Sequence, residues 1–111
     1  MLSLSGCHAR DESIDRSQLS ELASDIQAFH FCVAHAAVAL DDRRTAIVGV
    51  AERALDACSS QVKEISTLLN ATSMSDGEKS QYVDELIKVA ADRSAAMLRR
   101  LRAREDGTRE I

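Results

Sequence analysis

Proline is absent from this 111-residue chain, glycine occurs only four times, and aromatic residues make up 3% of the sequence. Proline and glycine mark turns and loops, so a chain that has so little of either is expected to have few loops. Hydrophobic residues still account for 45% of the chain, which excludes collagen-like, mucin-like and generic disordered proteins. Alanine, the strongest helix former, occurs seventeen times. The composition therefore predicts an all-α fold.

Long hydrophobic runs are also missing. The longest is residues 28–40, thirteen residues that include two histidines, and a bilayer-spanning helix needs ~20. The net charge of −4 provides no general attraction for nucleic acid or anionic membranes. Positive charge is concentrated in residues 93–111, with six arginines and three acidic residues. We predict no nucleic-acid partner, because these arginines are scattered around the helix and lack aromatic neighbours for base stacking.

Three cysteines, Cys7, Cys32 and Cys58, show no Cys-x-x-Cys spacing. An odd number without that spacing does not suggest a disulfide framework, so we expect reduced thiols and a cytoplasmic protein. The segment Leu4-Ser5-Gly6-Cys7 resembles the lipobox of bacterial lipoproteins. The resemblance implies that the residues before Cys7 are the end of a longer signal peptide, that Cys7 is lipidated, and that the protein is anchored in the periplasm. The other interpretation is a chance match of four residues.

Helical periodicity is strong from residue 19 to residue 69 and again from 83 to 101. Asp15 and Gln18 predict a capped helix start near Arg16. The polar stretch 70–77 predicts a turn, and Ser75 with Glu78 predicts the capping box of a helix over 78–104. The expected core positions are Leu19, Leu22, Ile26, Phe29, Val33, Ala36, Leu40, Ile47, Ala51, Ala54, Leu55, Cys58, Val62, Ile65 and Leu69, then Val83, Leu86, Ile87, Ala90, Met97, Leu98 and Leu101, with Ser94 inside the second stripe.

Residues 41–44, Asp-Asp-Arg-Arg, allow two architectures. Four consecutive charges favour a turn there, which would produce a three-helix bundle. However, this segment has no Gly, Pro or Asn, and the apolar phase passes through it unshifted. We therefore favour one long helix over 16–70 that forms a helical hairpin with the shorter antiparallel helix. The expected organisation is a flexible tail over 1–14, a single helical domain over 15–105 and a frayed tail over 106–111.

Residues 28–40 are apolar on both sides of the expected helix. Such a segment is buried on all sides, and in the long-helix model residues 16–44 have no partner within the chain. We expect a non-enzymatic protein–protein interaction module, of the adaptor, chaperone, immunity or inhibitor type, that forms a homodimer, binds another protein, or both. The predicted partner-binding residues are Phe29, Phe31, Val33, Val38 and Leu40.

Side chains that could carry chemistry are few. His30, Cys32 and His35 suggest a small metal-binding bundle as a further alternative, but the two histidines lie about 140° apart on a helix, so we predict no metal. The four glycines are isolated and form no phosphate-binding loop. No acidic pair stands in a pattern that predicts catalysis. We therefore predict neither enzymatic activity, nor a cofactor, nor a small-molecule substrate.

Overall fold

The computed structural model describes residues 16–110, and the side chains of residues 16–105. It contains four helices: α1 (Arg16–Leu40), α2 (Ile47–Ala57), α3 (Ser59–Leu69) and α4 (Asp76–Glu110). Within the described residues there is no β-strand. The predicted all-α fold is confirmed. Helix α1 begins at the first residue that the structure describes, so the expected helix start near Arg16 stays a prediction.

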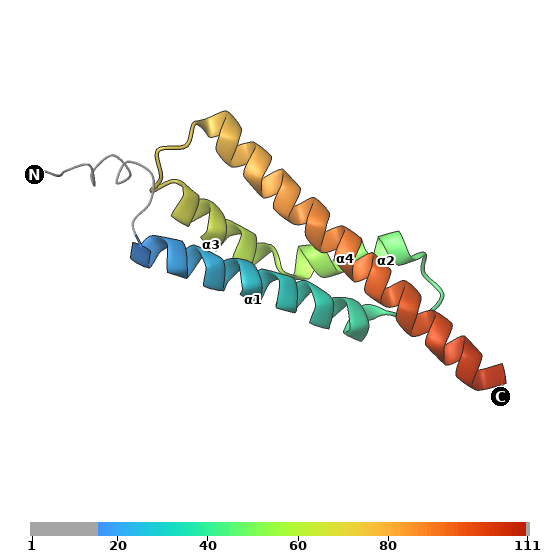
Figure 1. Cartoon of the computed structure of the whole chain (residues 1–111). Helices are drawn as coiled ribbons and strands as arrows, with labels where there is room; N and C mark the ends of the chain where they lie inside the picture. Colours follow the sequence, from blue (N-terminus) through green and yellow to red (C-terminus); the bar gives the residue numbers. More distant parts are fainter. Residues whose placement is uncertain (1–15, 111) are drawn as a thin grey trace, which may run out of the picture.

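The chain makes three passes along one long axis (Figure 1). Helix α1 runs in one direction, α2 and α3 return beside it, and α4 runs in the same direction as α1. The described part measures 71 × 25 × 17 Å, with a radius of gyration of 18.7 Å. A compact domain of this size has about 12–13 Å, so the molecule is a rod. The long helix over 16–70 that we favoured is therefore wrong, and the turn we considered at 41–44 is present.

Two aspartates build this turn without help from glycine. The Asp42 carboxylate accepts hydrogen bonds from the backbone N–H groups of Arg44 at 2.9 Å and Thr45 at 2.8 Å, and Asp41 accepts one from the N–H of Arg43 at 3.0 Å. Arg43 itself adopts a left-handed conformation with φ of 62°. Short carboxylate side chains replace the missing backbone partners in such turns, which is why the absence of Gly, Pro and Asn misled the prediction.

The second pass is divided at Cys58, which ends α2 and precedes α3 with φ of −109° and ψ of 20°. The next turn follows Leu69 and matches the prediction. Ser75 and Glu78 form the expected capping box: the Glu78 N–H donates to Ser75 Oγ at 3.2 Å, and the Ser75 N–H donates to Glu78 Oε1 at 2.8 Å. This reciprocal pair satisfies two backbone donors at the start of α4.

The core lies along the axis between the three passes. Its buried residues are Leu22, Phe29, Val33, Ala37, Val50, Ala51, Ala54, Cys58, Ile65, Leu69, Leu86, Ala90 and Leu98. Ser94 is also buried, and its hydroxyl donates to the carbonyl of Ala91 at 3.1 Å. Most of the predicted stripe is confirmed. The exceptions are Leu19 and Leu40, which are exposed, and Ala37 and Val50, which are buried although the stripe omitted them.

Helix α4 is 35 residues long and continues to Glu110, beyond the end that we expected near Arg104. Near its C-terminal end, α4 contacts the turn at 41–46 through two ion pairs, Glu105 with Arg43 and Arg102 with Asp41. The Asp15 cap, the tail over 1–14 and the lipobox cysteine Cys7 lie outside the described residues. The proposed domain limits stay a prediction.

Candidate functional site: the groove between α1 and α4

The five predicted partner-binding residues divide between the core and the surface. Phe29 and Val33 are 0% and 1% exposed, so the prediction that they are contact anchors is wrong. Because the chain turns after Leu40, α2, α3 and α4 cover the face of α1 that a long helix would have left open. Phe31, Val38 and Leu40 are 74%, 51% and 40% exposed. Their role in binding a partner stays a prediction.

Two exposed apolar side chains of α1, Phe31 and Val38, form a patch with His35 on one side of the helix. Phe31, His35 and Val38 follow one another at spacings of four and three residues, which places them on one helical face. The rings of Phe31 and His35 are stacked with centroids 6.2 Å apart and planes tilted by 19°. A phenylalanine that is three-quarters exposed leaves a large apolar surface in water, and such surfaces often mark interaction sites.

This patch borders a groove between α1 and α4 with a volume of about 500 Å³. Four residues of α1 and six of α4 line the groove: Gln27, His30, Phe31, Ala34, Ala90, Arg93, Ser94, Ala96, Met97 and Arg100. A shallower hollow continues the same groove toward the start of α4, where Tyr82, Glu85 and Val89 face Ile26 and His30. Small alanines on both walls keep the two helices close while leaving the space between them open.

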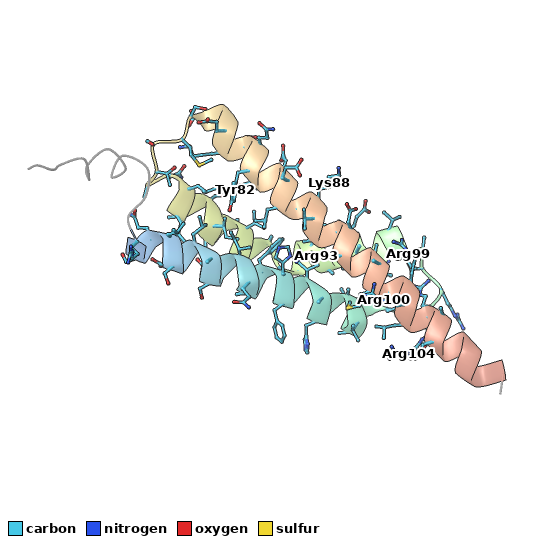
Figure 2. The ribbon with its side chains drawn as sticks, viewed as in Figure 1. Tyr82, Lys88, Arg93, Arg99, Arg100 and Arg104 are labelled. Atoms are coloured by element: carbon cyan, nitrogen blue, oxygen red, sulfur yellow. A yellow bond between two sulfur atoms is a disulfide. The ribbon has the colours of Figure 1, made fainter. Side chains whose placement is uncertain are left out.

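Two arginines give the α4 side of the groove a positive charge. Arg93 and Arg100 lie on the side of α4 toward α1, whereas Lys88 points the other way (Figure 2). They are seven residues apart, so about 10 Å separates them along the helix axis. Among the described residues, neither forms an ion pair, in contrast to Arg102, which is bonded to Asp41. The groove therefore combines an apolar floor with two available cations.

His30 lies where the groove and its continuation meet. Its partial burial, and secondarily the positive charge of Arg93, lower the pKa of the imidazole from its ordinary value of 6.5. Burial penalises the charged form, and a nearby cation does the same. The site at neutral pH therefore contains a neutral histidine between an arginine and an apolar wall.

The structure corrects our interpretation of the cysteines. Cys32 of α1 and Cys58, between α2 and α3, form a disulfide with a Cα–Cα distance of 6.1 Å. In a continuous helix these two residues would lie about 39 Å apart, so the wrong long-helix prediction also concealed the bond. The turn at 41–46 lies near the midpoint between the two cysteines and brings them face to face.

The disulfide also bears on the proposed metal ligands. The sulfur of Cys32 is bonded to that of Cys58 and has no thiolate to offer beside His30 and His35. In the described part of the chain, no group of three or more His, Cys, Asp or Glu side chains is placed to hold a metal ion. His35 instead stacks on Phe31.

Sequence reasoning missed the groove because it treated the arginines of α4 as a scattered set. Their contacts differ: Arg102 donates a hydrogen bond to Asp41 in the turn after α1, while Arg93 and Arg100 border the groove. These two kinds of contact can be told apart only from where α1 lies beside α4.

No helix within the described residues is both long enough and apolar enough to cross a membrane. No protein-family model, curated protein or solved structure matches the chain.

Proposed function

We propose that this chain is a non-enzymatic helix-binding module, in which the groove between α1 and α4 takes an amphipathic helix that carries acidic side chains. The observation that supports it is the position of Phe31, which is exposed to 74% at the edge of an open groove bordered by Arg93 and Arg100. Adaptors, chaperones, immunity proteins and inhibitors all work by such contacts, and the proposal does not choose among them.

The chemistry of the groove selects the type of helix. An apolar stripe on the ligand would cover Ala34 and Met97, with Phe31 packed against its side. Acidic residues seven positions apart on the ligand would repeat the spacing of Arg93 and Arg100. This is the helix-in-groove mode of recognition, in which apolar anchors supply affinity and charged borders set orientation.

A peptide experiment tests this proposal. The probe is a labelled synthetic helix with Glu at two positions seven residues apart and leucines between them, and binding is measured by fluorescence anisotropy. We expect Phe31→Asp to weaken binding at least tenfold, because it places a charge in the apolar contact. Leu19→Asp is the matched control, since Leu19 is also exposed on α1 but lies outside the groove.

The second control is the same peptide with Lys in place of both Glu residues, which should bind wild-type protein poorly. Equal binding of the two peptides, or equal binding by wild-type protein and Phe31→Asp, contradicts the proposal.

The Cys32–Cys58 disulfide favours a second candidate, a lipid-anchored envelope protein. Structural disulfides persist in oxidising compartments such as the bacterial periplasm and are rare in the cytoplasm. Two of the three cysteines are then bonded to each other, and the third is the lipobox residue Cys7. A periplasmic location would let the bond form and Cys7 act as the anchor.

Mass spectrometry of the protein purified from its native source tests this candidate. The expected result is a mature chain that begins at Cys7 with a diacylglyceryl group on its sulfur. An unmodified Cys7, or a coding sequence with a stop codon directly before Met1, excludes the lipid anchor.

A further inference from the structure

Charge on α4 is divided between its two halves. The first half, residues 76–92, carries the acidic residues Asp76, Glu78, Asp84, Glu85 and Asp92 against the two lysines Lys79 and Lys88. The second half, residues 93–110, carries six arginines, Arg93, Arg99, Arg100, Arg102, Arg104 and Arg109, against the three acids Glu105, Asp106 and Glu110. An antiparallel pair of such helices places opposite charges together, whereas a parallel pair places like charges together.

One face of α4 carries this pattern along the open groove. Glu85, Val89, Asp92, Ala96 and Arg100 follow one another at spacings of three or four residues, and so share a helical face. Glu85 and Val89 line the shallower end of the groove, and Ala96 and Arg100 line the deeper end. Glu85, Asp92, Arg93 and Arg100 are exposed, and none of them forms an ion pair within the described residues.

We infer that the acidic amphipathic helix that fills the groove is the first half of α4 of a second copy, bound antiparallel about a two-fold axis. This inference rests on the proposed function and names the partner of the same groove. Glu85 of each copy then lies opposite Arg100 of the other, and Asp92 lies opposite Arg93 beside the axis. All four charges are paired by one symmetric contact, as a closed two-fold dimer requires.

The apolar side chains between these charges fit the same register. Val89 lies opposite Ala96 of the second copy, and the small alanine lets the two helix axes approach closely. Phe31, on the α1 edge of the groove, then packs against the second copy's α4 instead of facing water. A single partner, the second copy, would therefore contact the groove, the exposed Phe31 and the two arginines at once.

Charge reversal in full-length protein tests the register. All variants carry Cys7→Ser, which removes any cross-link through that thiol, and their masses are measured by sedimentation equilibrium. We expect the otherwise unchanged protein to be a dimer, and Glu85→Arg and Arg100→Glu each to weaken association at least tenfold. A mixture of these two variants should form a one-to-one heterodimer, because the two reversed charges then face each other at one end of the contact while the native pair is kept at the other.

Arg53→Glu is the matched control, since Arg53 is exposed on α2, which does not line the groove, and its mass should not change. Circular dichroism establishes that each variant keeps its helix content. The inference is overturned if the protein without charge reversal is a monomer at millimolar concentration. It is also overturned if the mixture of the two variants stays monomeric. If the acidic peptide still binds such a monomer with dependence on Phe31, the proposed function stands and only the second copy is excluded.

Discussion

Arg102, on α4, holds Asp41, at the end of α1, through both carboxylate oxygens, with Nη2–Oδ1 at 2.5 Å and Nε–Oδ2 at 3.3 Å. The same guanidinium donates to the carbonyl of Thr45 at 2.8 Å. The Asp41 side chain is only 9% exposed. One arginine therefore connects the last pass of the chain to the turn that separates the first two, in the two-pronged geometry that strengthens such pairs.

Arg102→Ala should lower the free energy of unfolding by about 1–3 kcal/mol, because it leaves a mostly buried carboxylate and a backbone carbonyl without their donor. Urea unfolding followed by circular dichroism measures the change. Arg99→Ala, an exposed position on the same helix, is the control and should stay within about 0.5 kcal/mol of wild type. Equal effects of the two substitutions would show that the contact with Asp41 contributes nothing to stability.

The turn should also make the protein sensitive to acid. Hydrogen bonds from the Thr45 and Arg44 backbone N–H groups lower the pKa of Asp42 from 3.8 to about 2, and the Arg102 contact lowers the pKa of Asp41. A carboxyl group with a depressed pKa stabilises the fold fully above its unfolded pKa and loses that effect as the pH falls through the folded pKa. The melting temperature should therefore fall between about pH 4 and pH 2. Asp42→Asn, which keeps an acceptor that does not titrate, should show a shallower fall; an identical slope would exclude this role for Asp42.

The disulfide predicts both a thiol count and a loss of stability. In unfolded, unreduced protein, only Cys7 is left to react with a thiol reagent, one group per chain instead of three. The bond closes a loop between residues 26 positions apart, and the loop-entropy model assigns to it roughly 3.5 kcal/mol. We expect Cys32→Ala with Cys58→Ala to lower the free energy of unfolding by about 2–4 kcal/mol in urea titrations. Three reactive thiols per chain in the unfolded, unreduced protein would show that Cys32 and Cys58 are not bonded.

Phe29 and Phe31, two positions apart on α1, should respond oppositely to truncation. Phe29→Ala removes a fully buried ring and should cost about 3–5 kcal/mol of folding stability. Phe31→Ala removes an exposed ring and should change the stability of the monomer by less than about 0.5 kcal/mol. Thermal and urea unfolding at concentrations below self-association measure both. A large loss for Phe31→Ala there would place its ring in the core.

His30 should report on the charge of the groove. Burial, followed by the charge of Arg93, lowers its pKa below 6.5, so the stability linked to His30 is complete above pH 6.5 and is lost as the pH falls below it. Arg93→Gln should raise the pKa of His30, although not fully to 6.5, because the larger cause is burial. NMR titration of the imidazole protons measures this, with Arg99→Gln as the control. An unchanged pKa in Arg93→Gln would mean that the arginine is too far away or too well solvated to act.

Local patterns in the sequence predicted much of the fold. The Ser75–Glu78 capping box, the turn after Leu69 and the buried Ser94 all follow from side-chain chemistry within a few residues or from helical periodicity. These features depend on neighbours along the chain. The sequence is sufficient for them.

The turn at 41–46 could not be predicted from the same patterns. Its aspartates bond to backbone groups two and three residues ahead, but a helix interior tolerates the same residues on its surface. The apolar phase on either side of the turn is continuous, so periodicity could not reveal it. The available signal was the cysteine pair: a turn near residue 45 is the arrangement that brings Cys32 opposite Cys58. The groove depended on this turn, because α4 lies beside α1 only once the chain has reversed twice.

An odd number of passes leaves the two ends of the helical body at opposite poles (Figure 1). Whatever is attached ahead of Arg16 is held at one pole, and whatever follows Glu110 is held at the other, with most of the 71 Å length between them. If the chain is tethered ahead of Arg16, the arginine-rich end of α4 lies at the pole away from the tether. In the antiparallel dimer that we infer, the two chain starts would lie at opposite ends of the pair.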